Sequence, residues 1–94
     1  MEITGVITKI YPKKEGVTKN GRPWVAQWFV IEYEHSEFPK SIAFEIYGAE
    51  AIRLANLNTI GEAVTVKLNF TAEEYNGRPF NRVTAVSVKR SGKS

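Results

Sequence analysis

The side chains in this sequence that could act on another molecule are aromatic or basic rather than catalytic. Eleven of the 94 residues are Phe, Trp or Tyr, and 13 are Lys or Arg. Cysteine and aspartate are absent, all ten acidic residues are glutamate, and there is a single histidine. A thiolate nucleophile, a thiolate metal site and a histidine pair on zinc are therefore excluded. Stacking on flat rings and attraction of anions remain as the chemistry that this composition provides.

The acidic residues and the histidine do not form a recognisable catalytic or metal motif. His35 lies near Glu34 and Glu37, but their spacing matches no metal-binding pattern and a solvated loop is the simpler interpretation. Glu73 and Glu74 are neighbours in a predicted strand, so their side chains point to opposite faces and cannot flank one substrate. We therefore predict that the protein is not an enzyme and that it uses no metal and no cofactor.

Charge is distributed unevenly along the chain. Residues 1–22 carry a net charge of +3, residues 32–62 carry −4, and residues 63–94 carry +4. A fold that brings the two basic ends together would create one surface that attracts anions. The alternative interpretation is a set of solvated loops whose charge only improves solubility.

Alternation of apolar and polar residues predicts strands over most of the sequence. Five segments have this pattern or are rich in β-branched and aromatic residues: Glu2–Tyr11, Trp24–Tyr33, Ser41–Tyr47, Ala63–Ala72 and Phe80–Lys89. Gly5 marks a point of strong coiling or a bulge in the first strand, which ends before Pro12 because proline cannot donate to a ladder. The polar segment 13–22 contains two glycines and is predicted to be a loop.

Only residues Gly48–Leu57 break the alternation. Their alanines and leucines favour a helix, and Ile52 with Leu54 or Ala55 would form a short apolar stripe. The order is then three strands, a short helix and two strands. We predict an all-β fold, a five-stranded Greek-key barrel with one short helix between strands 3 and 4. Residues 1–89 would form a single domain, and residues 90–94 a short basic flexible tail.

One five-residue motif occurs twice. Asn20–Trp24 has the sequence Asn-Gly-Arg-Pro-Trp, and Asn76–Phe80 has the sequence Asn-Gly-Arg-Pro-Phe. Nothing else matches at the same spacing, which argues against a repeat architecture. Asn-Gly is typical of tight turns, and at Asn76-Gly77 it predicts a type I′ hairpin. We interpret the motif as two turns that meet the same geometric need, although the arginine in each would also allow both to flank one groove.

These features resemble the OB-fold, and within it small bacterial single-stranded DNA-binding (SSB-like) domains of uncharacterised function. The resemblance covers residues 2–89 and rests on these positions: Gly5, Pro12, the Asn20-Gly21 turn, Tyr47-Gly48 before the helix, and Gly61-Glu62-x-Val64-x-Val66. It implies a groove across strands two and three, walled by the loop after strand one and by the hairpin of strands four and five. Those two walls lie in the two segments of positive net charge.

Strand three places an aromatic residue on the solvent side. Ile42, Phe44 and Ile46 are its apolar set and should face the core, so Tyr47 should face outward. The resemblance implies a base-stacking aromatic directly before the glycine that precedes the helix, where Tyr47 stands. The alternative is that Tyr47 packs on the helix or in a subunit interface.

Strand two offers two further aromatic candidates. Phe29 and Ile31 are its predicted core pair, which leaves Trp28 outward as a stacking platform or, alternatively, a dimer contact. Trp24 has the same parity as Trp28 but follows Pro23, where strand geometry is often irregular. We prefer the interpretation that Trp24 plugs the barrel mouth, with nucleic-acid contact as the alternative.

The remaining candidates lie near the two walls of the groove. The resemblance implies an aromatic residue in the hairpin of strands four and five, where Tyr75 and Phe80 flank the turn. The basic candidates for phosphate contact are Lys19, Arg22, Lys67, Arg78 and Arg82. Such contacts give affinity and salt dependence without sequence preference, and any single one is more often simply solvated.

We therefore expect a non-catalytic domain that binds single-stranded nucleic acid by stacking on outward aromatics beside a basic rim. Single-stranded DNA is the favoured ligand, with RNA as the alternative. The alternative is an OB-fold protein–protein adaptor or oligomerisation module that uses the same aromatic face. SSB-like proteins assemble into dimers or tetramers, so the resemblance also implies a homo-oligomer. Glu32 and Glu45 on this face would repel phosphate unless they accept hydrogen bonds from bases. The acidic tail that is usual in SSB-type proteins has no counterpart here.

The sequence also favours a cytoplasmic protein with no membrane partner. No apolar run approaches the roughly 20 residues of a membrane span. Residues 1–10 carry two charged side chains and lack the apolar core of a signal peptide.

Overall fold

The computed structural model describes residues 1–33 and 40–90, without the side chain of Tyr75. In this part of the chain the elements are β1 (Glu2–Ile10), β2 (Lys14–Val17), β3 (Pro23–Tyr33), β4 (Lys40–Tyr47), α1 (Ala49–Ala55), β5 (Ala63–Tyr75) and β6 (Arg78–Arg90). The loop with His35, Glu34 and Glu37 lies outside the described residues, as do positions 91–94 of the predicted tail. Arg90, which the sequence placed in that tail, is the last residue of β6.

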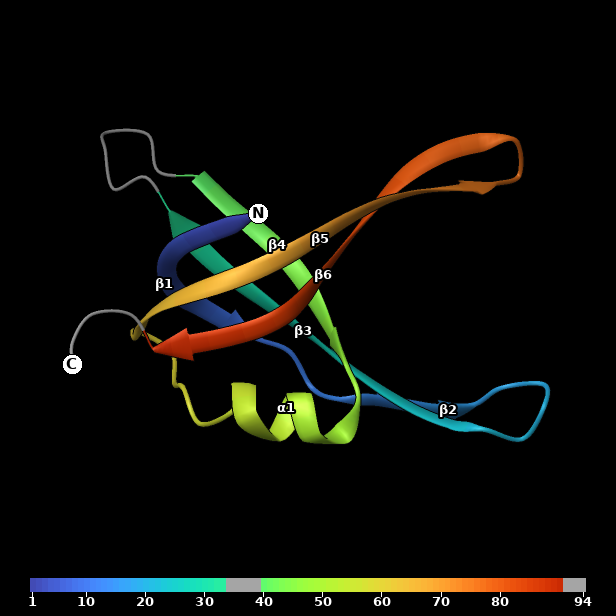
Figure 1. Ribbon diagram of the computed structural model, residues 1–94, viewed down its shortest axis with the longest axis horizontal. Coiled ribbons are helices and arrows are strands. Elements are labelled where there is room, and N and C mark those ends of the chain that lie inside the picture. Colours follow the sequence, from blue (N-terminus) through green and yellow to red (C-terminus); the bar gives the residue numbers. More distant parts are fainter. Residues whose placement is uncertain (34–39, 91–94) are drawn as a thin grey trace.

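Five of these strands close into a barrel in the order β1-β5-β6-β4-β3, with β1 paired again to β3 (Figure 1). The pairs are antiparallel except for β4 and β6, which meet in parallel at Glu45 and Thr84. Helix α1 lies across one end of the barrel and contacts β3, β4 and β6. The prediction of an all-β, five-stranded barrel with one short helix is confirmed.

One strand was not predicted. Residues Lys14–Val17, in the segment expected to be a loop, pair with the first residues of β3 and extend it into a hairpin outside the barrel. Counting this strand, the helix lies between the fourth and fifth strands rather than between the third and fourth. Gly16 leaves room for the Trp24 ring across the ladder, because a Cβ atom there would lie 2.5 Å from that ring.

The largest buried side chains of β3 and β4 are those that strand alternation assigned to the inner face. Phe29 and Phe44 are fully buried neighbours whose rings stack with centroids 5.9 Å apart. Ile31 and Ile46 are also buried, whereas Ile42 is only partly buried at the edge of the core. Burying each of these large side chains contributes about 1.5–3 kcal/mol to stability. The core therefore holds β3 and β4 side by side with their other faces turned away from the barrel interior.

Strand β1 coils strongly so that it can pair with β5 in its first half and with β3 in its second. At the change of partner, a Cβ atom on Gly5 would lie 2.6 Å from the backbone oxygen of Glu32. Glycine is needed there for this close approach, as the expected strong coiling implied. The bulge itself comes later, where the register with β3 shifts between Ile7 and Lys9.

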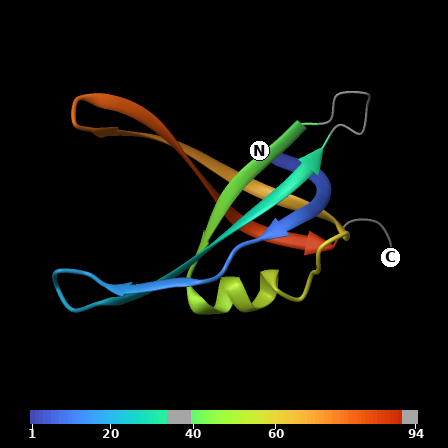
Figure 2. The ribbon, with the colours of Figure 1, turned by 180° about the vertical axis from the view of Figure 1, so that it is seen from behind.

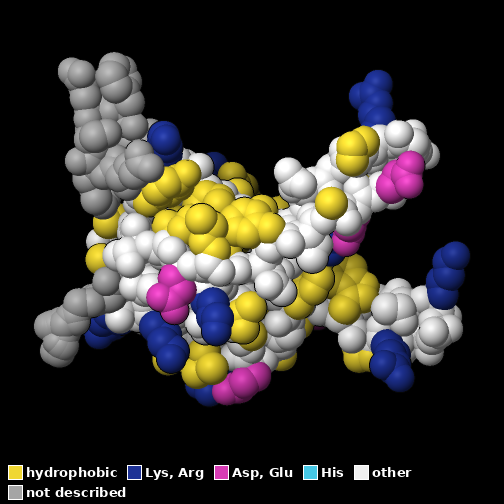
Figure 3. Space-filling model, turned by 45° about the horizontal axis from the view of Figure 1, so that its top comes forward, with side chains coloured by type: hydrophobic (Ala, Val, Ile, Leu, Met, Phe, Trp, Pro, Cys, Tyr) yellow, Lys and Arg dark blue, Asp and Glu magenta, His cyan; other side chains and the backbone are white. Residues whose placement is uncertain are grey.

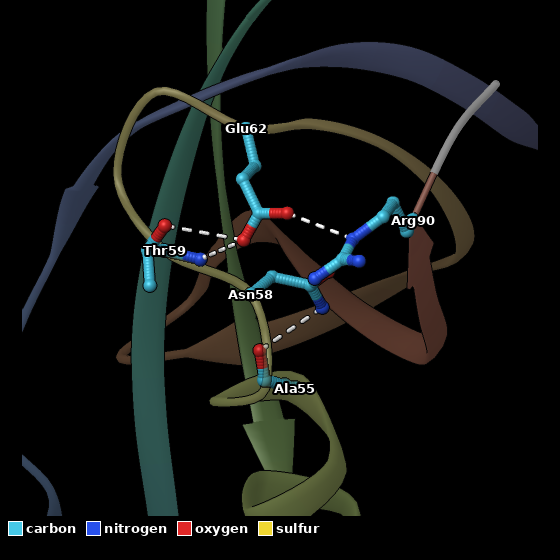
Figure 4. A network of polar contacts seen from close by, with 5 residues as sticks. All are labelled: Ala55, Asn58, Thr59, Glu62 and Arg90. Atoms are coloured by element: carbon cyan, nitrogen blue, oxygen red, sulfur yellow. Dashed lines mark hydrogen bonds and ion pairs between the residues drawn. The ribbon is translucent and has the colours of Figure 1, made fainter. Parts of the chain in front are cut away.

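The segment that joins α1 to β5 is fixed by a polar network at the end of the barrel (Figure 4). The Glu62 carboxylate accepts hydrogen bonds from the Thr59 N–H at 2.7 Å and the Thr59 hydroxyl at 3.1 Å. Arg90 Nε lies 2.8 Å from the other Glu62 oxygen. The buried Asn58 amide donates to the Ala55 carbonyl at 3.2 Å. These contacts hold the start of β5 and the end of β6 against the helix.

Two hairpins project from the same side of the barrel, as Figures 1 and 2 show from opposite directions. The N-terminal arm is residues 14–25, which comprise β2, its turn and the start of β3. The C-terminal arm is residues 70–83, which comprise the outer parts of β5 and β6. The twice-occurring Asn-Gly-Arg-Pro motif stands at the tip of each arm.

The two tips use different turns. Asn76 and Gly77 both have positive φ, at 53° and 76°, which is the predicted type I′ geometry. In the other turn Gly21 has a φ of 80°, while Asn76 is the one non-glycine residue with positive φ among the described residues. The Gly21 N–H donates to the Thr18 carbonyl at 2.9 Å, which closes a longer loop. The motif thus predicted both turns but only one of their conformations.

Candidate nucleic-acid interface

The outer face of β3 and β4 lies between the places where the two arms leave the barrel. Register pairs Trp28 with Glu45 and Ala26 with Tyr47 on this face, opposite to the face that carries Phe29. Tyr47 is 48% exposed and Trp28 is partly buried. The structure therefore places both aromatics on the outer face, where sequence parity expected them.

Trp24 and Tyr47 line one hollow of about 680 Å³, together with Lys14 and Glu45. The Trp24 ring lies over Gly16 within the N-terminal arm and is 45% exposed. Trp24 is thus not the plug of the barrel mouth that we preferred from the sequence. It stands on the arm because the missing side chain opposite, at Gly16, leaves room for the indole.

A second hollow, of about 390 Å³, lies beside Trp28 and is lined also by Tyr11, Lys13, Lys14 and Ala43. Lys14 lines both hollows, so they follow one another along the same face. A row of four aromatics results: Tyr11, Trp28, Trp24 and Tyr47. The row presents its rings, with Lys13, Lys14 and Glu45 beside them, to anything that lies across β3 and β4.

Tyr11 was not among the residues predicted from the sequence. It follows β1, where its N–H donates to the Trp28 carbonyl at 3.0 Å and its own carbonyl accepts from the buried Gln27 amide at 2.6 Å. Lys9 Nζ lies 4.9 Å from the centre of its ring. The available signal was the interleaving of Lys9, Tyr11 and Lys13 around Pro12, which is typical of surfaces that bind nucleic acid.

Tyr47 is bonded to the C-terminal arm. Arg82 Nη1 donates to the Tyr47 hydroxyl, and the guanidinium lies 5.8 Å from the ring centre. Arg82 Nε also pairs with Glu73 at 3.3 Å. Burial raises the pKa of the Tyr47 hydroxyl above 10.0, as do its hydrogen bond to Glu45 and the charge of that residue. The hydroxyl is therefore neutral at ordinary pH and connects the arm to the end of β4.

The C-terminal arm directs other predicted residues to the same face as Arg82. In the β5–β6 register, Thr71 pairs with Arg82, Glu73 with Phe80, and Tyr75 with Arg78. Phe80 and Arg78 therefore share the face of the arm that carries Arg82. Phe80 is 44% exposed. Tyr75 is the pairing partner of Arg78, but the structure does not describe its side chain.

The other predicted basic residues are divided between this region and the far side of the barrel. Lys19 and Arg22 are exposed in the tip of the N-terminal arm, where Arg22 N–H donates to the Thr18 hydroxyl at 3.1 Å. Basic side chains stand at the ends of both projecting arms in Figure 3. Lys67 is different, because it lies on β5 opposite Glu2, and β5 is separated from β3 and β4 by its neighbours β1 and β6. The structure does not bring Lys67 to the aromatic row.

Comparison with protein families identifies the chain. A family described as a domain of unknown function, DUF3127, matches residues 2–89. The chain belongs to the DUF3127 family. No curated protein matches this DUF3127 sequence.

Among solved structures, the DUF3127 chain is similar to the small single-stranded DNA-binding protein from Streptomyces coelicolor. The TM-score is 0.51 at 13% identity, with 97% of this chain and 92% of that chain covered. It is also similar to the Plasmodium falciparum SSB in complex with single-stranded DNA, with a TM-score of 0.51, 11% identity, and 98% and 93% covered. At these identities the likeness shows the fold alone, and the DUF3127 domain has the OB-fold of these two proteins.

The described residues lack two other kinds of feature. Between residues 1–33 and 40–90 no three His, Cys, Asp or Glu side chains are grouped so that they could hold a metal ion. In the same residues, no helix has the length and apolar character needed to cross a membrane.

Proposed function

We propose that this DUF3127 domain is a non-catalytic module that binds single-stranded nucleic acid, with single-stranded DNA as its main ligand. The strand would lie across the outer face of β3 and β4, between the two arms. The observation that carries this proposal is the aromatic row on that face, with two arms that end in basic residues beside it. Base–aromatic stacking is worth about 1–3 kcal/mol per base and tolerates any sequence.

The basic residues support the same use of the surface. Lys13 and Lys14 line the hollows beside the aromatic rings, so they can reach the phosphates that link stacked bases. Arg82 lies over Tyr47, and a guanidinium in that position can contact a phosphate while its ring neighbour holds a base. The shared fold with proteins named for binding single-stranded DNA is consistent with this proposal.

A titration of the protein into a fluorescein-labelled single strand tests the proposal. The strand has mixed sequence and about 16 nucleotides, the upper end of the site size of one OB-fold. We expect fluorescence anisotropy to rise on binding, and affinity to fall steeply between about 50 mM and 200 mM salt. The matching duplex should bind more weakly, because its bases cannot reach the rings. Absence of binding at the lower salt concentration would overturn the proposal.

The same titration distinguishes the adaptor alternative, in which the aromatic face contacts a protein. A homo-oligomer, expected from the resemblance, is a separate prediction, and light scattering after size exclusion measures it. If Tyr47→Ala leaves oligonucleotide affinity unchanged and dissociates an oligomer, the aromatic face is a subunit interface. If affinity falls while the oligomeric state stays the same, the face binds nucleic acid. RNA is compared with DNA by titrating the same sequence in ribonucleotide form.

A further inference from the structure

One carboxylate stands among the rings of the proposed binding face. Glu45 is directly opposite Trp28 in the β3–β4 register and two residues before Tyr47 on β4, on the same face as both. It lines the hollow that Trp24 and Tyr47 share. Side chains in such positions lie about 5 Å apart across a pair of strands and about 7 Å apart along one strand. Glu45 is therefore adjacent to two of the stacking platforms.

A carboxylate in this place is unfavourable for a surface that only holds phosphates. It repels the backbone of any nucleic acid that enters the groove. A base stacked on Trp28 or Tyr47 lies parallel to the ring and directs its edge toward the neighbouring side chains. The group that meets Glu45 is then the hydrogen-bonding edge of a base, which is free in a single strand.

We propose, on the basis of the function proposed above, that Glu45 makes this groove prefer guanine and disfavour thymine or uracil. The Watson–Crick edge of guanine presents two adjacent donors, N1–H and the N2 amino group, which match the two oxygens of one carboxylate. Cytosine and adenine offer one amino donor beside an acceptor nitrogen. Thymine and uracil offer one N–H between two carbonyl oxygens, and both of these oxygens are repelled by the carboxylate.

The neighbours of Glu45 position it for this role. The Tyr47 hydroxyl accepts from Arg82 Nη1, and its hydrogen bond to Glu45 is one of the causes that raise its pKa, so Glu45 lies beside a side chain that is itself held in place. A carboxylate has about four acceptor positions, and one bond from Tyr47 leaves enough for a two-donor base edge.

The test compares single strands of equal length, about 16 nucleotides, made of repeated thymine-thymine-X units in which X is guanine, cytosine, adenine or thymine. Isolated guanines avoid the four-stranded structures that runs of guanine form. We expect the guanine strand to bind about fivefold or more tightly than the all-thymine strand, with cytosine and adenine between them. In Glu45→Gln the amide can donate as well as accept, so the guanine-to-thymine ratio should fall toward one while thymine affinity rises.

Glu32→Gln is the matched control. Glu32 lies on the same face of β3 but four residues from Trp28, about 13 Å along the strand, and pairs with Ser41. Removing its charge should raise the affinity for all four strands alike and leave their ratio unchanged. Thermal unfolding of both variants verifies that the barrel is intact.

The outcomes separate this inference from the function on which it rests. Equal binding of guanine and thymine strands by the wild type would overturn the base preference and leave the binding function standing. A guanine preference that persists in Glu45→Gln would overturn the role of Glu45. Absence of binding by all four strands would overturn both proposals.

Discussion

The two arms have the same five-residue motif at their tips but are attached to the barrel differently. The C-terminal arm is linked to the aromatic row by one side-chain hydrogen bond, in which Arg82 on β6 donates to Tyr47 at the end of β4. The N-terminal arm is a direct extension of β3, and its Trp24 lies over Gly16 of the same arm. One arm thus brings a charge to a ring that belongs to the barrel, and the other brings its own ring.

This difference shows which property a short motif determines. In both arms Asn-Gly-Arg-Pro places a turn, an arginine and an aromatic residue at the start of a strand. The surroundings of the aromatic residue depend on what lies opposite, which is Gly16 for Trp24 and Glu73 for Phe80. We therefore expect the two arms to respond differently to equivalent substitutions.

The largest effect is expected for Tyr47→Ala, which removes both a proposed stacking ring and the partner of the C-terminal arm. Affinity for a single strand should fall by about 1–3 kcal/mol. Stability should change much less, because Tyr47 is half-exposed and outside the core. Anisotropy titration and thermal unfolding measure the two quantities on the same sample.

Tyr47→Phe is the control that separates the ring from the hydroxyl. The ring persists in this variant, but the hydrogen bond from Arg82 cannot form. If stacking carries the affinity, Tyr47→Phe should bind nearly as well as the wild type. Equal losses of affinity in Tyr47→Phe and Tyr47→Ala would instead assign the effect to the position of the arm.

Two glycine substitutions compare the arms directly. Gly77 has a φ of 76° with no other atom near its missing side chain, so Gly77→Ala strains the backbone and should cost about 1–2 kcal/mol of stability. Gly16→Ala instead places a methyl group against the Trp24 ring, which can move aside. We expect a smaller loss of stability and a changed Trp emission spectrum, measured in a Trp28→Phe background. An unchanged spectrum would contradict the packing of Trp24 over Gly16.

Much of this structure could be predicted because strand alternation has a regular period. The parity of β3 and β4 alone separates Phe29 and Phe44 from Trp28 and Tyr47. The strand Lys14–Val17 could not be predicted in this way. It is mostly polar and exposed, and backbone pairing with the start of β3 holds it in place.

The position of a side chain around the barrel was the other property that sequence could not supply. Alternation correctly places Lys67 outside the core, but barrel closure puts β5 on the side away from the aromatic row. Tyr11 was missed for the converse reason. It has the parity of the buried Ile7, but the bulge between Ile7 and Lys9 shifts the register, and pairing of that segment with β3 brings Tyr11 beside Trp28.

A smaller effect is expected when the arginines at the two tips are neutralised. In Arg22→Gln and in Arg78→Gln, the slope of log affinity against log salt should decrease by about 0.7 for each phosphate that the arginine no longer neutralises. Lys67→Gln, on the far side of the barrel, should leave the slope unchanged. If only one tip variant alters the slope, the arms are unequal in binding as well as in attachment. If Lys67→Gln alters it as well, the strand follows another path.

The smallest effect concerns two arginines of β6: Arg82, which contacts the Tyr47 hydroxyl and Glu73, and Arg90, the last residue of the strand, which contacts Glu62. Hydrogen bonds from the Thr59 N–H and hydroxyl and the charge of Arg90 lower the pKa of Glu62 below 4.5. The contribution of Glu62 to stability is therefore present above pH 4.5 and is lost as the pH falls through its folded-state value. Wild type and Glu62→Gln should differ in urea midpoint at about pH 6 and converge as the pH is lowered below 4.5. The Tyr47 hydroxyl behaves differently, because burial raises its pKa above 10.0, so it stays neutral through this acid range and continues to accept from Arg82. Acid should therefore loosen the end of the barrel that carries α1, while the C-terminal arm stays in place. If the affinity for a labelled single strand, measured by anisotropy, falls over the same pH range as the stability contribution of Glu62, this separation is contradicted.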